Sequence, residues 1–366
     1  MTRREMTMTS LAAAVAANTE AAGTLPEARF DPVAYSRERW SSAPLKMKFN
    51  ASNAGAVKAW QKKLRPKVAE LIGEFPAKKV ALEPRILATK DFGKYTREKL
   101  VFTSREGMDV LAYLLRPKSD KPLPVMVCVP GHGRGVDDIV GIDEKGNERT
   151  DKAGYQHDFA ISFAEQGIAA LAIEPLAFGY RRDPINTAKS QTQSACQPAA
   201  GAALLFGETM ISWRAYDVTR AIDYIETRKD LDAKRVGCVG ISGGGTCTLF
   251  ATALEPRIKV AMVSGYLNLW RDCILSLSHC MDNYVPGILN WAEMPDVAGL
   301  IAPRPLFCES GEKDNIFPVA SFKEAVNSVK KIYEVMGVPD LVQQEIHSGP
   351  HVFSGAKGIP FIAAHL

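Results

Sequence analysis

Ser242 has the sequence surroundings of a nucleophile. It lies in the segment VGCVGISGGGTCTLF (236–250), where an apolar run reaches the turn GISGG and small residues follow. A strand, a tight G-x-S-x-G turn and a helix would lift the serine hydroxyl clear of the backbone. A glycine-rich turn without chemistry is the alternative, but the segment has no Walker lysine and lacks the G-x-G-x-x-G spacing of a nucleotide loop. The pattern favours a nucleophilic serine.

A serine nucleophile needs a general base, for which histidine is the usual choice. In doubly wound enzymes with such a turn, the triad follows the order serine, acid, histidine. Of the six histidines, this order leaves His347, His351 and His365, which come late enough in the chain to follow both Ser242 and an acid. We prefer His351, because Gly349-Pro350 predicts a turn that directs it back towards the sheet. His347 ends a strand-like run and stays open as the alternative, whereas His365 is at the end of the sequence.

The acid is expected on a loop after a strand between these two residues. The segment RPLFCESGEKDNIFP (304–318) supplies an apolar run and then Asp314, followed by an apolar Ile-Phe-Pro. A carboxylate there would hold the imidazole tautomer and stabilise the imidazolium. Glu309 and Glu312 are rivals for this role.

An oxyanion site needs a second backbone N–H, from the loop after an earlier strand. VMVCVPGHGRG (125–135) has the form of a buried strand followed by glycines that allow close approach. The expected donors are the backbone N–H groups of Gly243 and His132.

The chain around these residues alternates apolar strand-like runs with helical segments. From residue 122 onward this order predicts βαβ units and a largely parallel sheet. Before it, residues 98–117 predict a hairpin that forms an antiparallel edge. Residues 54–73 predict an amphipathic helix that is kinked or broken at Pro66. We expect an α/β fold with domains at 95–366 (catalytic), 24–94 (an extension packing on it) and 1–23 (a tail).

Composition excludes several classes of protein. The net charge of +4 and the lack of a basic run argue against a nucleic-acid partner, and no apolar stretch is long enough for a membrane span. The seven cysteines form no CxxC or Cys/His metal pattern, and several lie in apolar strand-like runs. A disulfide among Cys196, Cys273 and Cys280 is possible if the protein is exported.

Arg3-Arg4 and the following alanines have the outline of a twin-arginine signal, which leaves export and a cytoplasmic location both open.

Substrate-binding residues are less strongly indicated. Arg134 and Arg181 lie on loops after buried strands, where such sheets bind ligands, and could contact a carboxylate or sugar hydroxyls. Solvated surface arginines are the plainer interpretation. Aromatic residues in the variable segment 270–300 could wall a pocket or simply pack: Trp270, Tyr284 and Trp291.

The sequence over about residues 95–366 resembles the α/β-hydrolase superfamily, in its dienelactone-hydrolase-like and acetyl-xylan-esterase-like branch. The motifs are GHGRG (131–135), KRVGCVGISGGG (234–245), APRPLFCESGEKDNIFP (302–318) and GPHVF (349–353). The resemblance implies a doubly wound α/β-hydrolase fold, a triad of Ser242, Asp314 and His351, and no metal or organic cofactor. It implies hydrolysis of short-chain acyl or carbohydrate esters. In relatives the oxyanion loop usually begins His-Gly, where this chain has Pro130-Gly131, and dienelactone hydrolases use cysteine in place of the serine.

Two other functions fit parts of the pattern. A serine peptidase of the prolyl-oligopeptidase type would share the triad, but residues 1–94 are too few for the β-propeller of that group. An inactive hydrolase fold could serve as a binding module, although the three triad residues in order argue against it.

Overall fold

The computed structural model describes residues 30–185 and 194–366. Contacts divide the chain into two units, residues 1–42 and residues 43–366. The described part of the first unit contains helix α2 (Pro32–Ser41), which the Asp31 carboxylate caps by accepting the N–H groups of Val33 and Ala34. The segment expected to be a signal or tail, residues 1–23, lies outside the described residues.

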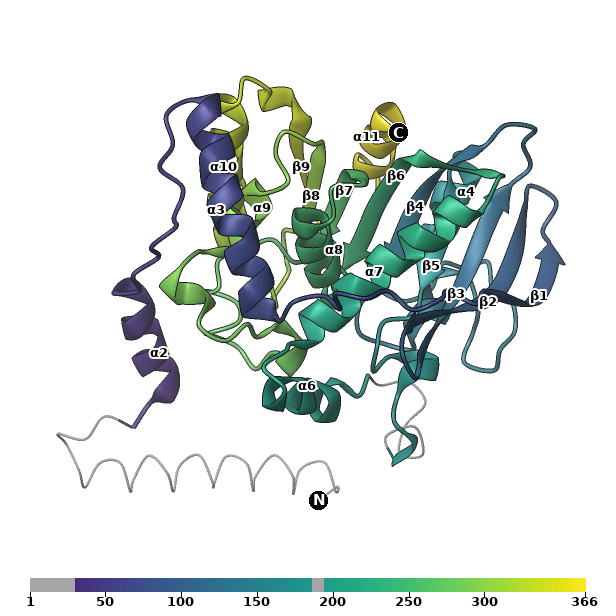
Figure 1. The fold of residues 1–366 in the computed structure, drawn as a ribbon, viewed down its shortest axis with the longest axis horizontal. Coiled ribbons are helices and arrows are strands. Elements are labelled where there is room, and N and C mark those ends of the chain that lie inside the picture. Colours follow the sequence, from purple (N-terminus) through teal and green to yellow (C-terminus); the bar gives the residue numbers. More distant parts are fainter. Residues whose placement is uncertain (1–29, 186–193) are drawn as a thin grey trace, which may run out of the picture. The chain divides into compact units, whose positions relative to one another are not determined.

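The described residues of the second unit build a nine-stranded sheet in the order β1-β2-β3-β5-β4-β6-β7-β8-β9 (Figure 1). Pairing is antiparallel from β1 to β5 and parallel from β5 to β9, so the predicted hairpin and the parallel sheet are both confirmed. The strands are β1 (Arg85–Asp91), β2 (Tyr95–Arg105), β3 (Met108–Pro117), β4 (Leu123–Val129), β5 (Ala169–Ile173), β6 (Leu231–Ile241), β7 (Ile258–Ser264), β8 (Leu306–Gly311) and β9 (Val342–His347).

Helices cover both faces of the sheet, which explains why its central strands are apolar throughout. On β4, Val125 and Val127 pack in one cluster with helix α7, whereas Met126 and Cys128 pack in another with α4 and α11. The first face carries α3 (Ala54–Ile72), α7 (Met210–Thr227), α8 (Gly243–Leu254), α9 (Met294–Gly299) and α10 (Val319–Val335), and the opposite face carries α4 (Phe159–Glu165) and α11 (Gly358–His365).

Helix α3 belongs to the same unit as the sheet. It runs from Ala54 to Ile72 as one helix with Pro66 inside it, so the predicted helix is confirmed and, of the two expected effects of Pro66, a kink or a break, the break is wrong. Pro66 is exposed, and the buried Leu64 and Val68 on either side of it pack into the cluster that includes β7 and β8. Tertiary packing outweighs the ~3 kcal/mol that an interior proline costs a helix.

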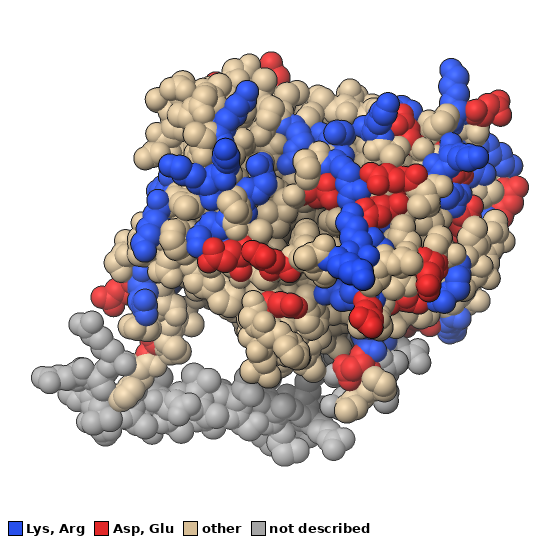
Figure 2. Space-filling view, viewed as in Figure 1, with Lys and Arg blue, Asp and Glu red and all other residues tan. Residues whose placement is uncertain are grey.

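Charged side chains of both signs are interspersed over much of the face seen in Figure 2. Lysines gather over α3, where Lys58, Lys62 and Lys63 are exposed. Among the described residues, no helix combines the length and apolar character needed to cross a bilayer.

Candidate active site

Ser242 forms the turn between β6 and α8. Its backbone has φ 57° and ψ −123°, a conformation that side-chain-bearing residues rarely adopt. The turn is fixed on both sides, because the N–H of Ser242 donates to the carbonyl of Ser264 and its own carbonyl accepts the N–H of Thr246 in α8. The side chain is partly exposed, whereas Gly243 behind it is buried. A strained, well-anchored backbone thus presents the hydroxyl at the carboxyl end of the sheet.

Glycines allow this turn to pack closely against β4. A Cβ on Gly244 would collide with the carbonyl oxygen of Val129 and lie 2.8 Å from that of Pro130. A Cβ on Gly131 would lie 3.1 Å from the Cβ of Ser242. The loop after β4 and the serine turn are therefore in backbone contact.

His351 and Asp314 form a short, buried pair. Nδ1 of His351 lies 2.6 Å from Oδ2 of Asp314, and Oδ1 of the same carboxylate accepts the N–H groups of Ile316 and Phe317. Asp314 follows β8 and is 6% exposed, and His351 lies on the loop after β9. Nε2 of His351 is buried and has no hydrogen-bond partner among the described residues.

The rival residues lie in other environments. Nδ1 of His347 accepts the N–H of Gly349. Glu309 is fully buried, where its carboxylate accepts the hydroxyl of Ser264 and the backbone N–H groups of Ser354 and Gly355. Burial raises the pKa of Glu309 to about 7. Glu312 is exposed. Of the histidines and carboxylates considered from sequence, the structure joins His351 and Asp314.

Two sets of contacts bring Ser242 and His351 to the same place. Ser264 bonds the backbone of Ser242, and the next residue, Gly265, lies against the His351 ring, whose Cε1 would be 2.8 Å from an added Cβ. On the other side, Tyr155 touches Gly131 beside the serine and stacks on His351 at 5.7 Å. Phe317 stacks on His351, also at 5.7 Å.

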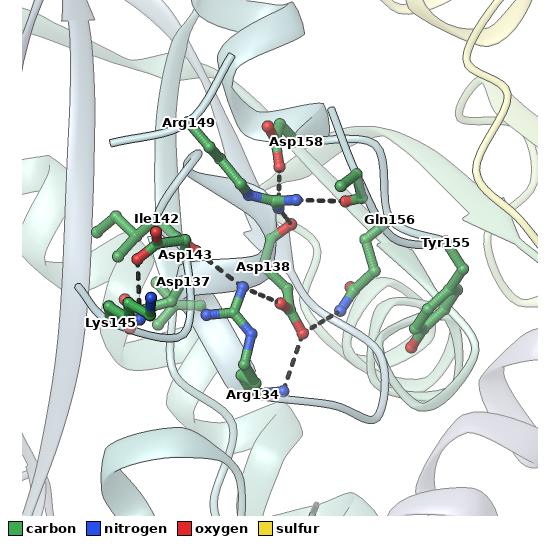
Figure 3. Close-up of polar contacts among 12 residues, drawn as sticks. Arg134, Asp137, Asp138, Ile142, Asp143, Lys145, Arg149, Tyr155, Gln156 and Asp158 are labelled. Carbon is green, nitrogen blue, oxygen red and sulfur yellow. Dashed lines mark hydrogen bonds and ion pairs between the residues drawn. The ribbon is translucent and has the colours of Figure 1, made fainter. Parts of the chain in front are cut away.

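A polar network holds the loop after β4. Gln156 accepts the N–H of Gly131, and the Tyr155 hydroxyl donates to the carbonyl of His132. Figure 3 shows the Asp138 carboxylate accepting hydrogen bonds from the backbone of Arg134 and the side chain of Gln156 and forming an ion pair with the Arg134 guanidinium. The predicted oxyanion loop is thus braced by side chains from the segment that carries Tyr155.

Buried Glu174 joins this loop to the one after β5. Its carboxylate accepts the N–H groups of Val136 and Tyr180, and burial raises its pKa to about 8. A side chain at Gly135 or Gly179 would overlap the carboxylate, and both glycines have positive φ. The two loops are therefore built around one acidic side chain.

The ring of His132 lies against Gly243, with Cε1 2.8 Å from where a Cβ on that glycine would be. Its Nε2 lies 3.2 Å from Oδ2 of Asp282, and the same carboxylate forms an ion pair with Arg214. Burial opposes a charge on His132, but Asp282 outweighs it, and the pKa of the imidazole is raised to about 9. Asp282 thus favours the charged form of His132 beside the serine turn.

The residues predicted to bind substrate have internal partners. The Arg134 guanidinium contacts Asp138 and the carbonyl of Ile142, as Figure 3 shows. Arg181 donates to Asp217 and to the carbonyl of Glu174, and its side chain is only 6% exposed. Trp270 is 3% exposed within the core. Both arginines are therefore engaged by internal ion pairs, Arg134 with a residue four positions along the chain and Arg181 with a distant one.

One group at the site was missed from sequence. Cys196 starts helix α6 (Cys196–Leu205) and lies beside His132 and Asp282, whereas Cys273 is buried elsewhere and donates to the carbonyl of Leu269. All seven cysteines are free thiols, so Cys196, Cys273 and Cys280 form no disulfide in this structure. The Cys280 thiol hydrogen-bonds Cys196 and lowers its pKa to about 5, with Arg214 contributing. Local spacing carries no signal for this group, because 64 residues separate His132 from Cys196.

Comparisons with known proteins identify the family and the fold of this chain. A model of the Abhydrolase family matches residues 43–354. The chain belongs to the Abhydrolase family. YtaP of Bacillus subtilis, named as a candidate hydrolase, is 25% identical over 75% of this chain and 89% of its own.

This Abhydrolase-family chain also aligns with solved structures. A candidate acetyl xylan esterase from Bacteroides fragilis gives a TM-score of 0.74 at 20% identity, covering 88% of this chain and 83% of the other. A glucuronoyl esterase from Solibacter usitatus gives 0.63 at 20% identity, covering 84% and 93%. These likenesses show the α/β-hydrolase fold.

Proposed function

We propose that the protein is a serine-dependent carboxylic-ester hydrolase that works through an acyl-enzyme. The observation that carries the proposal is the His351–Asp314 pair. Its imidazole lies against Gly265 and Tyr155, which adjoin the Ser242 turn, and its Nε2 has no hydrogen-bond partner among the described residues. A serine on a strained strand-to-helix turn, a histidine and a buried carboxylate form the arrangement that activates a hydroxyl for attack on an acyl carbon.

In the first half-reaction, Oγ of Ser242 bonds to the carbonyl carbon while Nε2 of His351 takes the hydroxyl proton. The carbonyl oxygen becomes an oxyanion, for which we assign the backbone N–H groups of Gly243 and His132 as donors. Collapse of the intermediate breaks the bond to the alcohol oxygen, and the alcohol leaves with the proton from His351. In the second half-reaction, a water molecule bonds to the acyl carbon while His351 takes one of its protons. Collapse then breaks the bond between the acyl carbon and Oγ of Ser242, which recovers the proton from His351 as the carboxylic acid leaves.

Asp314 acts on the base through Nδ1. Its carboxylate keeps the proton on that nitrogen and stabilises the imidazolium formed in each half-reaction. The two backbone N–H groups on Oδ1 hold the carboxylate in place for this role.

We further propose that the substrates are short-chain acyl esters or carbohydrate esters. The structural relatives named as an acetyl xylan esterase and a glucuronoyl esterase support this choice. Because the predicted arginines Arg134 and Arg181 have internal partners, we assign no substrate contact to either.

Hydrolysis of p-nitrophenyl acetate by the wild type and by Ser242→Ala, His351→Ala and His347→Ala tests the mechanism. We expect turnover by the wild type and by His347→Ala, loss in the other two, and labelling of Ser242 by a fluorophosphonate. A wild type that neither hydrolyses the ester nor takes the label would overturn the proposal, and loss in His347→Ala alone would reassign the base. Acetate release from acetylated xylan, compared with p-nitrophenyl acetate, then tests the carbohydrate assignment.

A further inference from the structure

Four side chains with metal-binding atoms meet beside the oxyanion loop. His132 follows β4, Cys196 begins α6, and Cys280 and Asp282 lie at the 3-10 helix η3 (Met281–Asn283). One ligand atom from each lies within 4.8 Å of the others. Asp282 and Cys196 are 2% exposed, whereas Cys280 is partly exposed.

The distances among three of these atoms match one face of a tetrahedron around a zinc ion. Nε2 of His132 is 3.2 Å from Oδ2 of Asp282 and 3.5 Å from Sγ of Cys196, and that sulfur is 3.4 Å from Oδ2. Bonds of about 2.0–2.3 Å to zinc give tetrahedral edges of roughly 3.3–3.8 Å. Cys280 supplies the fourth corner after a shift of about 1 Å, which its partly exposed position allows.

The charges around the cluster also suit a divalent cation. Two thiolates and one carboxylate carry three negative charges, which Zn²⁺ and the guanidinium of Arg214 would neutralise. Arg214 contacts Asp282, and its Nη2 lies 3.2 Å from Sγ of Cys196. The carbonyl of Leu176 and the ring of Phe178 hold the guanidinium from the other side. An arginine in this position orients the ligands from the second layer around the metal.

An ion can reach the cluster from outside. A cavity of about 640 Å³ is lined by Cys196, Cys280 and residues of α6 and η3. Both cysteines therefore line the space from which a metal would arrive.

We propose that His132 Nε2, Cys196 Sγ, Cys280 Sγ and Asp282 Oδ2 form a binding site for one thiophilic divalent cation, of which Zn²⁺ is the best match. The combination of two sulfurs, an imidazole and a carboxylate favours zinc over the oxygen-seeking Mg²⁺ and Ca²⁺. The site is separate from the serine chemistry, but the ring of His132 connects them, because its other edge lies against Gly243. Bound metal would fix the position of that ring and of the loop that carries it.

Zinc binding to the reduced full-length protein, measured by competition with a chromophoric chelator, tests the proposal. We expect one Zn²⁺ per chain. In Cys196→Ala and Cys280→Ala we expect zinc affinity to fall by more than about 100-fold, since replacing a residue that merely contacts a ligand already lowers metal affinity by about 10- to 100-fold. Cys273→Ala removes a buried thiol outside the cluster and should bind zinc like the wild type. Co²⁺ in place of zinc should give thiolate charge-transfer absorption that both ligand variants lose.

A second measurement uses the wild type alone and does not depend on the variants folding. Zinc should protect Cys196 and Cys280 from alkylation by iodoacetamide, as mapped by mass spectrometry. The proposal is overturned if reduced wild type binds no stoichiometric zinc, if Cys273→Ala weakens binding as much as Cys280→Ala, or if zinc leaves both thiols equally reactive. None of these readouts depends on ester hydrolysis, so the two proposals can fail separately.

Discussion

The carboxylate of Asp314 divides its two oxygens between the base and the backbone. Oδ2 lies 2.6 Å from Nδ1 of His351, and Oδ1 accepts the N–H groups of Ile316 and Phe317 at 2.8 and 2.9 Å. The loop after β8 thus fixes the carboxylate, and the carboxylate fixes the imidazole.

Asp314→Asn should keep the loop and lose the activity. The amide oxygen can still accept the two backbone N–H groups, but the amide nitrogen then faces Nδ1 and favours the wrong imidazole tautomer. We expect kcat for p-nitrophenyl acetate to fall by about 10³- to 10⁴-fold with little change in Tm. Glu312→Gln, on the exposed part of the same loop, is the matched control and should retain activity. Comparable activity in Asp314→Asn would contradict the assigned role.

Ser242→Gly should be inactive but more stable than Ser242→Ala. Both variants lack the nucleophile, whereas only glycine adopts φ 57° without strain. We expect the glycine variant to exceed the alanine variant by about 1 kcal/mol in free energy of unfolding. Urea denaturation of the two inactive proteins measures the difference, and equal stability would mean that this backbone conformation stores no strain.

Gly244→Ala should destabilise the fold, because the new methyl group would overlap the carbonyl oxygen of Val129. Backbone atoms cannot move aside cheaply, so we expect a loss of about 2–4 kcal/mol together with displacement of the serine turn. Gly201→Ala is the control: it lies in α6, and nothing is within 4 Å of the added Cβ. That change should be neutral or stabilising by up to about 1 kcal/mol. Thermal unfolding of both variants provides the comparison.

Glu174 should make stability depend on pH. Burial raises its pKa from 4.5 to about 8, so between these values the folded chain binds a proton that the unfolded chain does not. The contribution of Glu174 to stability is therefore full below about pH 4.5 and is lost as pH rises through about 8. The slope inside this window is at most about 1.4 kcal/mol per pH unit.

Glu174→Gln should flatten this dependence. Denaturation of both proteins at pH 5 to 9 should show the difference in unfolding free energy, wild type minus variant, decreasing as pH rises. Exposed Glu106→Gln serves as the control and should follow the wild type at every pH. A difference that stays constant with pH would show that Glu174 does not titrate in this range.

Features set by local sequence were predictable. The turn at Ser242 follows from an apolar run, closely spaced glycines and small residues, which are neighbours in the chain. Asp314 and His351 could be picked out because chain order in doubly wound sheets limits which loops reach the serine.

Features set by long-range packing were not predictable. Arg181 reads as a surface residue, yet it pairs with Asp217 from another helix. Pro66 predicts a kink or a break in the helix, yet α3 continues through it because its neighbours Leu64 and Val68 pack in the core. The thiols of Cys196 and Cys280 meet His132 only after three distant segments converge, so no spacing rule could have found them.

The contacts of the His351 ring have a consequence for the direction of proton movement. Tyr155 and Phe317 both stack on the imidazole, at interplanar angles of 25° and 27°, and a flip about its Cβ–Cγ bond would break the hydrogen bond between Nδ1 and Asp314. Nδ1 and Nε2 therefore cannot exchange places during turnover. A proton taken up at Nε2 can leave only from the side on which it arrived, so the same nitrogen serves both halves of the cycle without any rearrangement of the ring.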